Sequence, residues 1–257
     1  MEEIKRKVEK LVKLDKKEEI VKRLQEINKL FLTDYMLKLN DLCIYPIEVE
    51  AYYHNCDKNF CDPFVYLNVS QKNNFGKLYC HRSGMDVCLS DSENYYFGLL
   101  IRAAYIKDEE NVMFGPKNIK NNVFVQYKII QHVEPGKTIK ETLEEIDPVI
   151  TKVKNDLREK VNEQCPVFNT TRFGLKPKED DFSEFIKDPL RSFIELQKHK
   201  PYKWPSKKEE AVETYIIDNI NKIGNDCEKI KNKIIELLEY DSPKMRERIM
   251  KCNEVKK

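Results

Sequence analysis

Residues 47–53 read Ile-Glu-Val-Glu-Ala-Tyr-Tyr, and this stretch decides how the rest of the chain is interpreted. Side chains alternate between the two faces of a strand, so Glu48 and Glu50 share one face and the apolar residues share the other. A half-buried strand gains nothing from two acids on a covered face. We therefore expect at least one of the two carboxylates to have a chemical role.

Two later segments carry side chains that suit a pocket for a flat, polar ligand. Residues 76–85 read Gly-Lys-Leu-Tyr-Cys-His-Arg-Ser-Gly-Met, and residues 99–103 read Leu-Leu-Ile-Arg-Ala. The first is typical of a hairpin that presents aromatic, histidine and arginine side chains. The second is an apolar strand that ends in an arginine. Together with the acidic strand, they favour a binding pocket.

Short strands are expected through the middle of the chain. Asn, Asp and Gly residues mark the turns, and the close spacing favours antiparallel pairing over a repeated strand–helix–strand unit. We predict an α+β fold, with a curved, mainly antiparallel β-sheet and surrounding helices. The expected strands cover residues 44–53, 64–69, 77–81, 86–89 and 95–105.

Helical patterns lie on both sides of the strand region. Apolar residues recur with a 3.6-residue period near the N-terminus, and Ser206 with Glu209 forms a complete capping box. We predict an N-terminal helical segment (1–39), a core domain (40–203) and a C-terminal helical extension (204–257). Both terminal segments are expected to pack on the core, with contact to a protein partner or to DNA as the alternative. Further helices are expected at 141–162, divided at Asp147-Pro148, and at 211–223, 228–240 and 243–252.

Composition narrows the class of protein. Charged residues make up 35% and hydrophobic residues 40% of the 257 residues, which is typical of a soluble globular protein. The net charge is only +2, from 46 basic and 44 acidic residues, so nucleic-acid binding would need a local basic face. No run approaches the roughly 20 apolar residues of a membrane span, and the first residues are charged, so we expect a cytoplasmic protein without membrane contact. Seven glycines and no glycine-rich loop argue against a nucleotide-binding fold.

The chain has eight cysteines, which we expect to be reduced thiols in a cytoplasmic protein. Five candidate ligands raise the question of zinc: His54, Cys56, Cys61, Cys80 and His81. The Cys-x4-Cys spacing is at the loose end for a structural zinc site, and no second Cys-x2-Cys pair follows. We therefore expect buried or incidental cysteines and no metal.

In this order, the motifs resemble those of the alkyladenine (3-methyladenine) DNA glycosylases. That family has a V-E-T-E-A-Y strand, a G-T-L-Y-V-Y…Y-G-M hairpin and an L-L-R-A strand, which the segments above match in turn. Residues 172–175 (Arg-Phe-Gly-Leu) and 188–193 (Asp-Pro-Leu-Arg-Ser-Phe) resemble its R-V-G-V and K-P-L-R-F segments. Gly115-Pro116 falls where the family has Gly-Pro before a helix. The resemblance covers roughly residues 40–200, and four motifs in register argue against coincidence.

The resemblance implies hydrolysis of the bond between a base and deoxyribose C1′. Glu50 stands at the position of the catalytic glutamate, where a carboxylate orients and deprotonates water and offsets the positive charge of an oxocarbenium-like sugar. Glu48 matches the family's other glutamate, although a salt-bridged strand acid is the simpler interpretation. No lysine lies near Glu50 in the motif, so the expected product is an intact abasic site, and no cofactor is expected.

The resemblance also implies that the base is flipped out of the duplex and stacked on aromatic faces. Tyr52 matches a stacking tyrosine, and Arg102 matches an arginine near the flipped nucleotide. Asp62 falls roughly where the family has a histidine that contacts the base. The residues expected to bind the base or the DNA are Tyr52, Asp62, Tyr79, His81, Arg82, Asp86, Ser90, Arg102, Arg172 and Arg191.

The chain departs from the family at four positions. His81 replaces a second stacking tyrosine, and Arg82-Ser83 replaces the wedge tyrosine, so Arg82 or another residue must fill the gap left by the base. Ser90 replaces an asparagine whose bulk screens guanine-type bases, and Asp86 is new. These changes favour a different and larger base. The alternatives are an ordinary hairpin role for His81 and a turn or salt-bridge role for Asp86.

The leading prediction is a monofunctional DNA glycosylase for a modified or damaged base. Two substrates compete: alkylated purines, which the altered pocket disfavours, and a bulky non-standard base in foreign (phage) DNA, removed as a defence. One alternative is a non-catalytic nucleic-acid-binding module on the same fold, which would not need Glu50. Another is a helical interaction protein that uses residues 206–257, which would explain only the tail.

Overall fold

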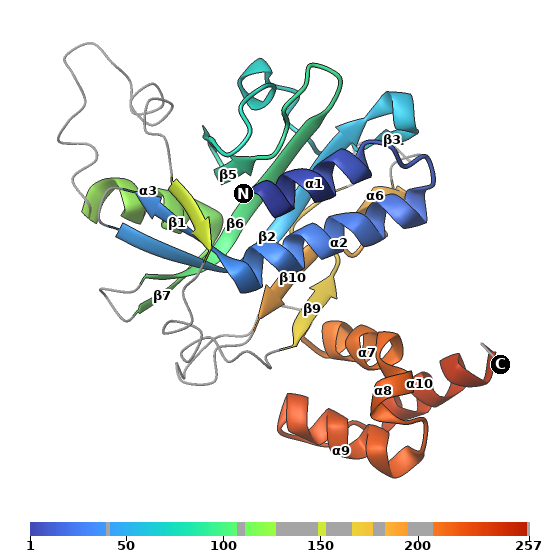
Figure 1. The fold of residues 1–257 in the computed structure, drawn as a ribbon. Coiled ribbons are helices and arrows are strands. Elements are labelled where there is room, and N and C mark those ends of the chain that lie inside the picture. Colours follow the sequence, from blue (N-terminus) through green and yellow to red (C-terminus); the bar gives the residue numbers. More distant parts are fainter. Residues whose placement is uncertain are drawn as a thin grey trace.

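The structure, a computed structural model, describes residues 1–39, 42–106, 111–126, 149–152, 166–176, 183–194 and 208–255. Within these residues a ten-stranded sheet lies at the centre and helices pack on it (Figure 1). The pairings between its strands are antiparallel. The predicted α+β class with a mainly antiparallel sheet is therefore confirmed.

The main path through the sheet follows the order β4-β5-β6-β2-β1-β8. Three branches leave this path: β10 pairs with β2 and with β9, β3 pairs with the end of β2, and β7 pairs with β6. The long strands β2 and β6 pair along most of their length and form the centre of the sheet. The strands are β1 (Tyr35–Leu39), β2 (Leu42–Asn55), β3 (Phe60–Cys61), β4 (Leu78–His81), β5 (Gly84–Cys88), β6 (Tyr96–Ile106), β7 (Asn111–Phe114), β8 (Val149–Lys152), β9 (Val167–Thr170) and β10 (Arg191–Ile194).

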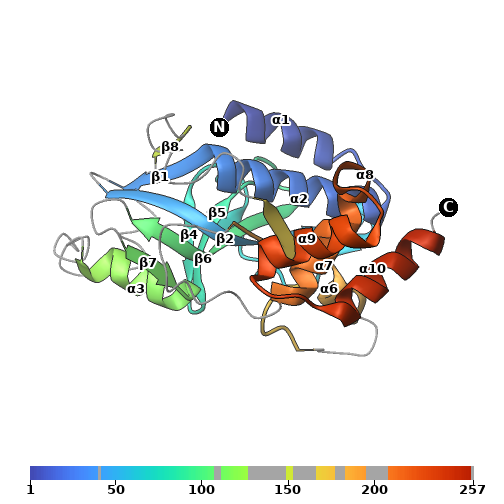
Figure 2. The same ribbon diagram turned by 90° about the horizontal axis from the view of Figure 1, so that it is seen from below.

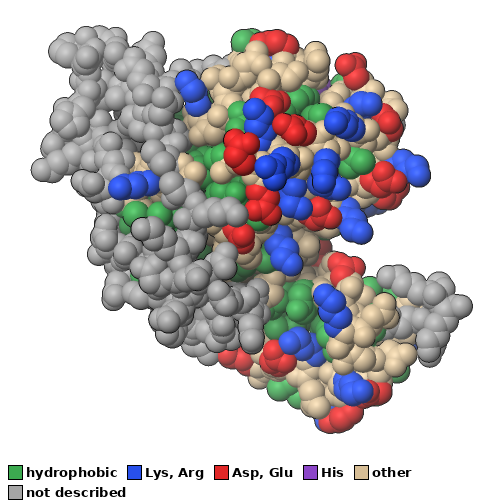
Figure 3. Space-filling view, in the orientation of Figure 1, with side chains coloured by type: hydrophobic (Ala, Val, Ile, Leu, Met, Phe, Trp, Pro, Cys, Tyr) green, Lys and Arg blue, Asp and Glu red, His purple; other side chains and the backbone are tan. Residues whose placement is uncertain are grey.

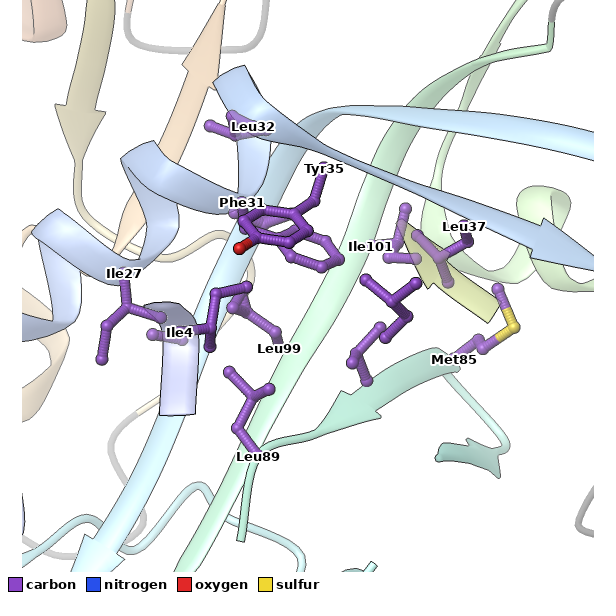
Figure 4. Close-up of a cluster of buried hydrophobic side chains, with 14 of the residues drawn as sticks. Ile4, Ile27, Phe31, Leu32, Tyr35, Leu37, Met85, Leu89, Leu99 and Ile101 are labelled. Carbon is purple, nitrogen blue, oxygen red and sulfur yellow. The ribbon is translucent and has the colours of Figure 1, made fainter. Parts of the chain in front are cut away.

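Helices lie on both sides of the sheet (Figure 2). From α1 and α2, Ile4 and Phe31 pack toward Leu99 and Ile101 of β6 (Figure 4). On the other side, α3 begins at Pro116, a residue suited to the first helical turn, and packs on β5 and β6. No helix in the described part of the chain is long and apolar enough to cross a membrane. The helices are α1 (Glu2–Leu11), α2 (Lys17–Asp34), α3 (Pro116–Gln126), α6 (Ser183–Lys187), α7 (Lys208–Asp218), α8 (Ile220–Ile223), α9 (Cys227–Leu238) and α10 (Pro243–Val255), with 3-10 turns η1 (Cys56–Lys58) and η2 (Val69–Gln71).

The alternation predicted for residues 47–53 explains why the two faces of β2 have different surroundings. Val49 and Ala51 are fully buried in the hydrophobic core beneath α1 and α2. Glu48, Glu50 and Tyr52 take the opposite face, since successive side chains of a strand point to opposite sides. One face of the central strand therefore builds the core, and the other is available for a site.

The C-terminal helices enclose a second hydrophobic cluster. α7, α9 and α10 surround it (Figure 1), and Phe168 of β9 and Phe193 of β10 join it to the sheet. The two rings stack with their centroids 5.3 Å apart, and the ring of Tyr215 from α7 lies 5.3 Å from that of Phe168. The helical tail is thus held on the sheet edge by aromatic packing.

Four segments differ from the sequence predictions. Residues 35–39 form β1 rather than the end of a helix, because their buried side chains alternate with period two. Residues 64–69 form no strand, and several of their apolar side chains are exposed instead. Residues 149–152, inside the predicted helix 141–162, form β8 against β1. The rest of that helix, and the capping box at Ser206, lie outside the described residues.

The fourth difference is a break in the predicted helix 211–223. Asn219 separates α7 from α8, and its side chain donates to the carbonyl of Tyr215 at 2.9 Å. Asn side chains compete with the helical backbone for such contacts, which explains why the helix divides at this residue.

Phe168→Ala should destabilise both the sheet edge and the C-terminal cluster, because it removes a fully buried ring that contacts both. The expected loss in the free energy of unfolding is about 3–5 kcal/mol, measured by urea denaturation. Ile235→Ala, at a position 38% exposed on α9, is the matched control and should change this free energy little. Equal denaturation midpoints for the two variants would show that Phe168 does not join the two clusters.

Candidate active site

A pair of compensating register shifts places Arg102 beside the acids of β2. In the pairing of β2 with β6, the register shifts between Pro46 and Glu48 and shifts back between Glu48 and Val49. Bulges of this kind re-aim side chains and are frequent next to active sites. They also accommodate Pro46, which has no N–H for the ladder, within a central strand.

Glu48 lies in an ion-pair chain that connects three strands. It accepts from Arg102 Nε of β6 at 2.9 Å and from Arg191 Nε of β10 at 2.7 Å. The side chains of Glu48, Arg102 and Arg191 are 6%, 14% and 3% exposed. Glu48 is therefore the salt-bridged strand acid that was the simpler of its two interpretations. Arg191, which was predicted to bind the base or DNA, is instead occupied in this buried contact.

Glu50 is fully buried and is held by three donors. Its Oε1 accepts the backbone N–H of Phe173 at 2.7 Å. Its Oε2 accepts the Tyr52 hydroxyl at 2.9 Å and Arg102 Nη1 at 3.2 Å. Both oxygens of the buried carboxyl group therefore have hydrogen-bond donors, one of them a guanidinium. Burial, followed by the charge of Glu50, raises the pKa of Tyr52 well above its ordinary value of 10.0, so Tyr52 keeps the proton that it donates.

Asp62 and Arg172 form a second buried ion pair, with Oδ2 2.5 Å from Nη1. Asp62 also accepts the backbone N–H of Phe64, and Arg172 donates to the carbonyl of Phe185. Both side chains are 0% exposed, so this geometry does not support the predicted contact of either with a base or with DNA. The guanidinium of Arg172 lies 4.7 Å from the ring centroid of Tyr52 and supports that ring from behind.

A cavity of about 310 Å³ opens beside this network. Four of the predicted binding residues line it, and these are Tyr52, His81, Asp86 and Arg102. The rings of Phe64, Tyr66 and Phe173 form much of the remaining wall. Glu50 itself is not part of the lining. The three residues that donate hydrogen bonds to it, Tyr52, Arg102 and Phe173, all belong to the wall. The predicted catalytic acid therefore lies directly behind the cavity surface.

Polar contacts fix Asp86 in the cavity wall. His81 Nδ1 accepts the backbone N–H of Ser83 at 3.2 Å, which leaves Nε2 as the donor to Asp86 Oδ1 at 3.1 Å. On the other side, Gln71 Nε2 donates to Asp86 Oδ2 at 3.3 Å. The Asp86 carboxylate lies close to the backbone of β6 at Gly98. A Cβ at this position would lie only 2.9 Å from Asp86 Oδ2, so glycine is needed there. Asp86 is thus both a partner of His81 and part of the wall.

Three other predicted binding residues do not line the cavity. Ser90 is fully buried in a turn, where its hydroxyl donates to the carbonyl of Tyr95 at 2.8 Å. The prediction that Ser90 lies at the pocket and leaves room for a larger base is therefore corrected: its hydroxyl closes a turn. Tyr79 is buried behind His81, and the two rings stack with centroids 5.7 Å apart. Arg82 is exposed in the turn between β4 and β5.

The sequence did not identify three aromatic residues that the structure brings to the cavity: Phe64, Tyr66 and Phe173. Tyr66 is 49% exposed, and its ring lies 4.8 Å from that of His81. Phe173 is 52% exposed, and the guanidinium of Arg102 lies 5.2 Å from its ring. Because residues 64–69 were predicted to form a strand, the position of Tyr66 in the cavity wall was not expected. The available signal for Phe173 was its place in the Arg-Phe-Gly-Leu segment, where the resembled family has a smaller valine.

The hairpin formed by β2 and β3 holds the chain's cluster of potential metal ligands. Cys56 and Cys61 are joined by a disulfide, which corrects the prediction that all eight cysteines are reduced thiols. His54 is the third member, and the ligand atoms of the three residues lie within 4.8 Å of one another. Across the residues that the structure describes, the cluster does not extend to Cys80 or His81.

Comparison with known proteins identifies no relative. No model of a known protein family matches the chain. No curated protein matches it either. The resemblance to the alkyladenine DNA glycosylases therefore depends on the motifs alone.

Arg172→Met should cost about 3–5 kcal/mol in the free energy of unfolding, because it leaves Asp62 buried without its cation. Adding Asp62→Asn should recover about 1–3 kcal/mol, since a neutral amide is cheaper to bury. Urea denaturation of the single and double variants measures this coupling. Arg248→Met, in the exposed pair with Glu213, is the matched control and should change stability little. Strict additivity of the two buried substitutions would contradict the ion pair.

Proposed function

We propose that this chain is a monofunctional DNA glycosylase, a divergent relative of the alkyladenine type, that hydrolyses the N-glycosidic bond of a flipped, modified base and leaves an abasic site. One observation carries the proposal: Glu50 lies directly behind an aromatic-walled cavity and shares Tyr52 and Arg102 with it. A preorganised carboxylate at this place would stabilise an oxocarbenium-like sugar whose base occupies the cavity.

The cavity offers aromatic faces on which a flipped base can stack. Tyr52 of β2 and His81 of β4 contribute faces from two strands, and Tyr66 adds a third. Arg172 behind Tyr52 and Tyr79 behind His81 keep these rings in place. Stacking of a base on an aromatic side chain contributes about 1–3 kcal/mol. This gain offsets part of the cost of removing the base from the duplex.

Glu50 becomes available to water when the wall at Phe173 moves. The Phe173 N–H occupies Oε1, and half of the Phe173 side chain is at the surface. Gly174 follows at φ +75°, and no atom lies within 4 Å of the position its Cβ would take. Movement of this segment as the base enters frees Oε1, while Tyr52 and Arg102 keep Oε2 in place.

In this mechanism Glu50 Oε1 takes a proton from a water molecule, and the resulting hydroxide bonds to C1′. The base leaves with the electron pair of the N-glycosidic bond. Arg102 Nη1 and the Tyr52 hydroxyl both contact Oε2 and not Oε1, so Oε1 is the oxygen that takes the proton. The nucleophile is water and not a side-chain amine, so no Schiff base forms on the sugar and the sugar–phosphate backbone stays intact.

The rim of the cavity suits contact with duplex DNA. Large apolar side chains are exposed on the loop that contributes Tyr66: Tyr66 is 49%, Leu67 55% and Val69 75% exposed. Tyr66 Oη lies 3.4 Å from Ser83 Oγ, so this loop adjoins the turn that carries Arg82. Two groups are therefore candidates to fill the gap that the flipped base leaves in the duplex: an apolar side chain of this loop, and Arg82. The face shown in Figure 3 instead mixes Lys and Arg with Asp and Glu.

The polar side of the cavity favours a base that carries a hydrogen-bonding substituent. Asp86 is an acceptor in the wall, and the neighbouring Gln71 Oε1 is buried without a hydrogen-bond partner in the described part of the chain. A methyl group on an alkylated purine offers no donor to Asp86, whereas a substituent with an N–H or O–H group adds a hydrogen bond to this acceptor. A hydroxylated or sugar-bearing base, as in modified phage DNA, would supply donors. This supports a role in defence against foreign DNA.

A second candidate is a nucleic-acid-binding module without catalysis. The observation in its favour is that Glu50 is fully buried and absent from the cavity lining, as a purely structural acid would be. In that case the ion-pair network would only shape the pocket. Base release separates the two functions, because a binding module produces no abasic sites.

Glu50→Gln should lower base release by roughly 100- to 10,000-fold, because the amide cannot accept the proton of water. DNAs that carry a panel of modified bases are incubated with protein, and alkaline cleavage reveals abasic sites. The variant also loses its ion pair with Arg102, so assays are run well below its melting temperature and circular dichroism verifies folding. Glu9→Gln, on the exposed side of α1, is the control and should keep full activity. Undiminished turnover by Glu50→Gln would overturn the mechanism.

Asp86→Asn should impair excision of a hydroxylated or sugar-bearing base by about tenfold or more, because it removes an acceptor at constant size. Binding to DNA should remain unchanged, since phosphate contacts supply most of the affinity. Excision rates on such bases, on 3-methyladenine and on hypoxanthine are compared. The exposed Asp241→Asn serves as the control. A preference for the simple purines, with no effect of Asp86→Asn, would refute this account of selectivity.

A further inference from the structure

The hairpin at the end of β2 gathers three potential metal ligands outside the cavity lining. His54 comes from β2, Cys56 from η1 and Cys61 from β3. His54 and Cys61 face each other across the strand pair. Asn59, in the left-handed conformation at φ 54°, closes the turn and donates its N–H to Cys56 O at 3.0 Å. The backbone therefore brings the three ligands together by itself.

The hydrogen bonds of His54 orient its ring as a metal ligand. Nδ1 lies 3.0 Å from the carbonyl oxygen of Asp62, and a carbonyl can only accept, so Nδ1 carries the proton. In the neutral ring, Nε2 then has a free lone pair, and it lies 3.2 Å from Cys56 Sγ. A disulfide sulfur has no proton to offer this lone pair. Histidines that bind zinc commonly donate from the other nitrogen to a carbonyl or carboxylate.

Solvent exposure and charge also fit a divalent cation. Cys56 is exposed, and His54 and Cys61 are partly exposed, so an ion can reach all three. Two thiolates and one imidazole supply three ligands of a tetrahedral zinc site and leave the fourth position to water. Two thiolates also balance the charge of Zn²⁺. The sequence named His54 among five candidate ligands but argued against zinc from the Cys-x4-Cys spacing; the pairing of His54 with Cys61 across β2 and β3 is what brings it to the two cysteines.

We propose that His54, Cys56 and Cys61 bind one Zn²⁺ in the reduced protein, and that the Cys56–Cys61 disulfide excludes it. Reduction by a phosphine breaks the S–S bond: phosphorus takes the oxygen of one water molecule, and each sulfur takes one of its protons. Binding of Zn²⁺ then releases both thiol protons to solvent and forms two Zn–S bonds and one Zn–N bond. The hairpin thus holds a disulfide in the oxidised protein and a zinc site in the reduced protein.

Zinc content as a function of oxidation state tests this proposal. One sample is reduced with a water-soluble phosphine under nitrogen, and another is left oxidised. Both are mixed with excess ZnCl₂, desalted and analysed by mass spectrometry for zinc. The reduced protein should retain one zinc per chain and the oxidised protein none. With Co²⁺ in place of Zn²⁺, the reduced protein should show a thiolate charge-transfer band and tetrahedral ligand-field bands.

Variants assign the ligands. Cys61→Ser and His54→Gln should each weaken zinc binding by about tenfold or more, with folding verified by circular dichroism. Cys227→Ser, at an exposed free cysteine of α9, is the matched control and should bind zinc as the unmodified chain does. Equal zinc in the oxidised protein, undiminished binding by Cys61→Ser, or a cobalt spectrum without a thiolate band would each overturn the proposal. The cobalt spectrum needs only the unmodified chain, so it decides even if a variant fails to fold.

Discussion

The burial of two glutamates on one face of the central strand is the constraint on which the site depends. A buried charge without a partner costs several kcal/mol, so Glu48 and Glu50 require cations and other donors from neighbouring elements. Arg102 of β6 meets both acids, and Arg191 of β10 meets Glu48. These contacts bring β6 and β10 to the two sides of β2. A well-packed apolar set would stabilise the sheet equally well, so the network is better explained by a function of the face it builds.

The same arrangement fixes the side chains of the cavity wall. The ring of Tyr52 faces the cavity, while its hydroxyl holds Glu50 and the guanidinium of Arg172 supports it from behind. Arg172 in turn is fixed by Asp62, the residue whose carbonyl orients His54 in the metal-ligand hairpin. In the proposed glycosylase, rigid support of this kind would keep Glu50 and Tyr52 in position during the reaction. It also connects the cavity wall to the disulfide hairpin through one residue.

Local periodicity allowed part of the fold and site to be predicted, and long-range contacts account for the rest. The alternation in residues 47–53 is set by strand geometry, so the separation of Glu48, Glu50 and Tyr52 from the core could be read directly from the sequence. The burial of Arg172 and Arg191 could not, because their partners are 110 and 143 residues away along the chain. Ser90 was misplaced for a related reason: counting along a motif fixes sequence distance but not the turn that redirects the chain.

The most direct test of the account is a crystal structure of the protein bound to duplex DNA that contains one 2′-fluorinated nucleotide with a sugar-bearing base, because the fluorine slows cleavage of the glycosidic bond. We expect this base to lie outside the helix, between Tyr52 and His81, with its C1′ facing Glu50 Oε1 and Phe173 displaced. A base that stays stacked in the duplex, or DNA bound on another face with the cavity unfilled, would contradict it.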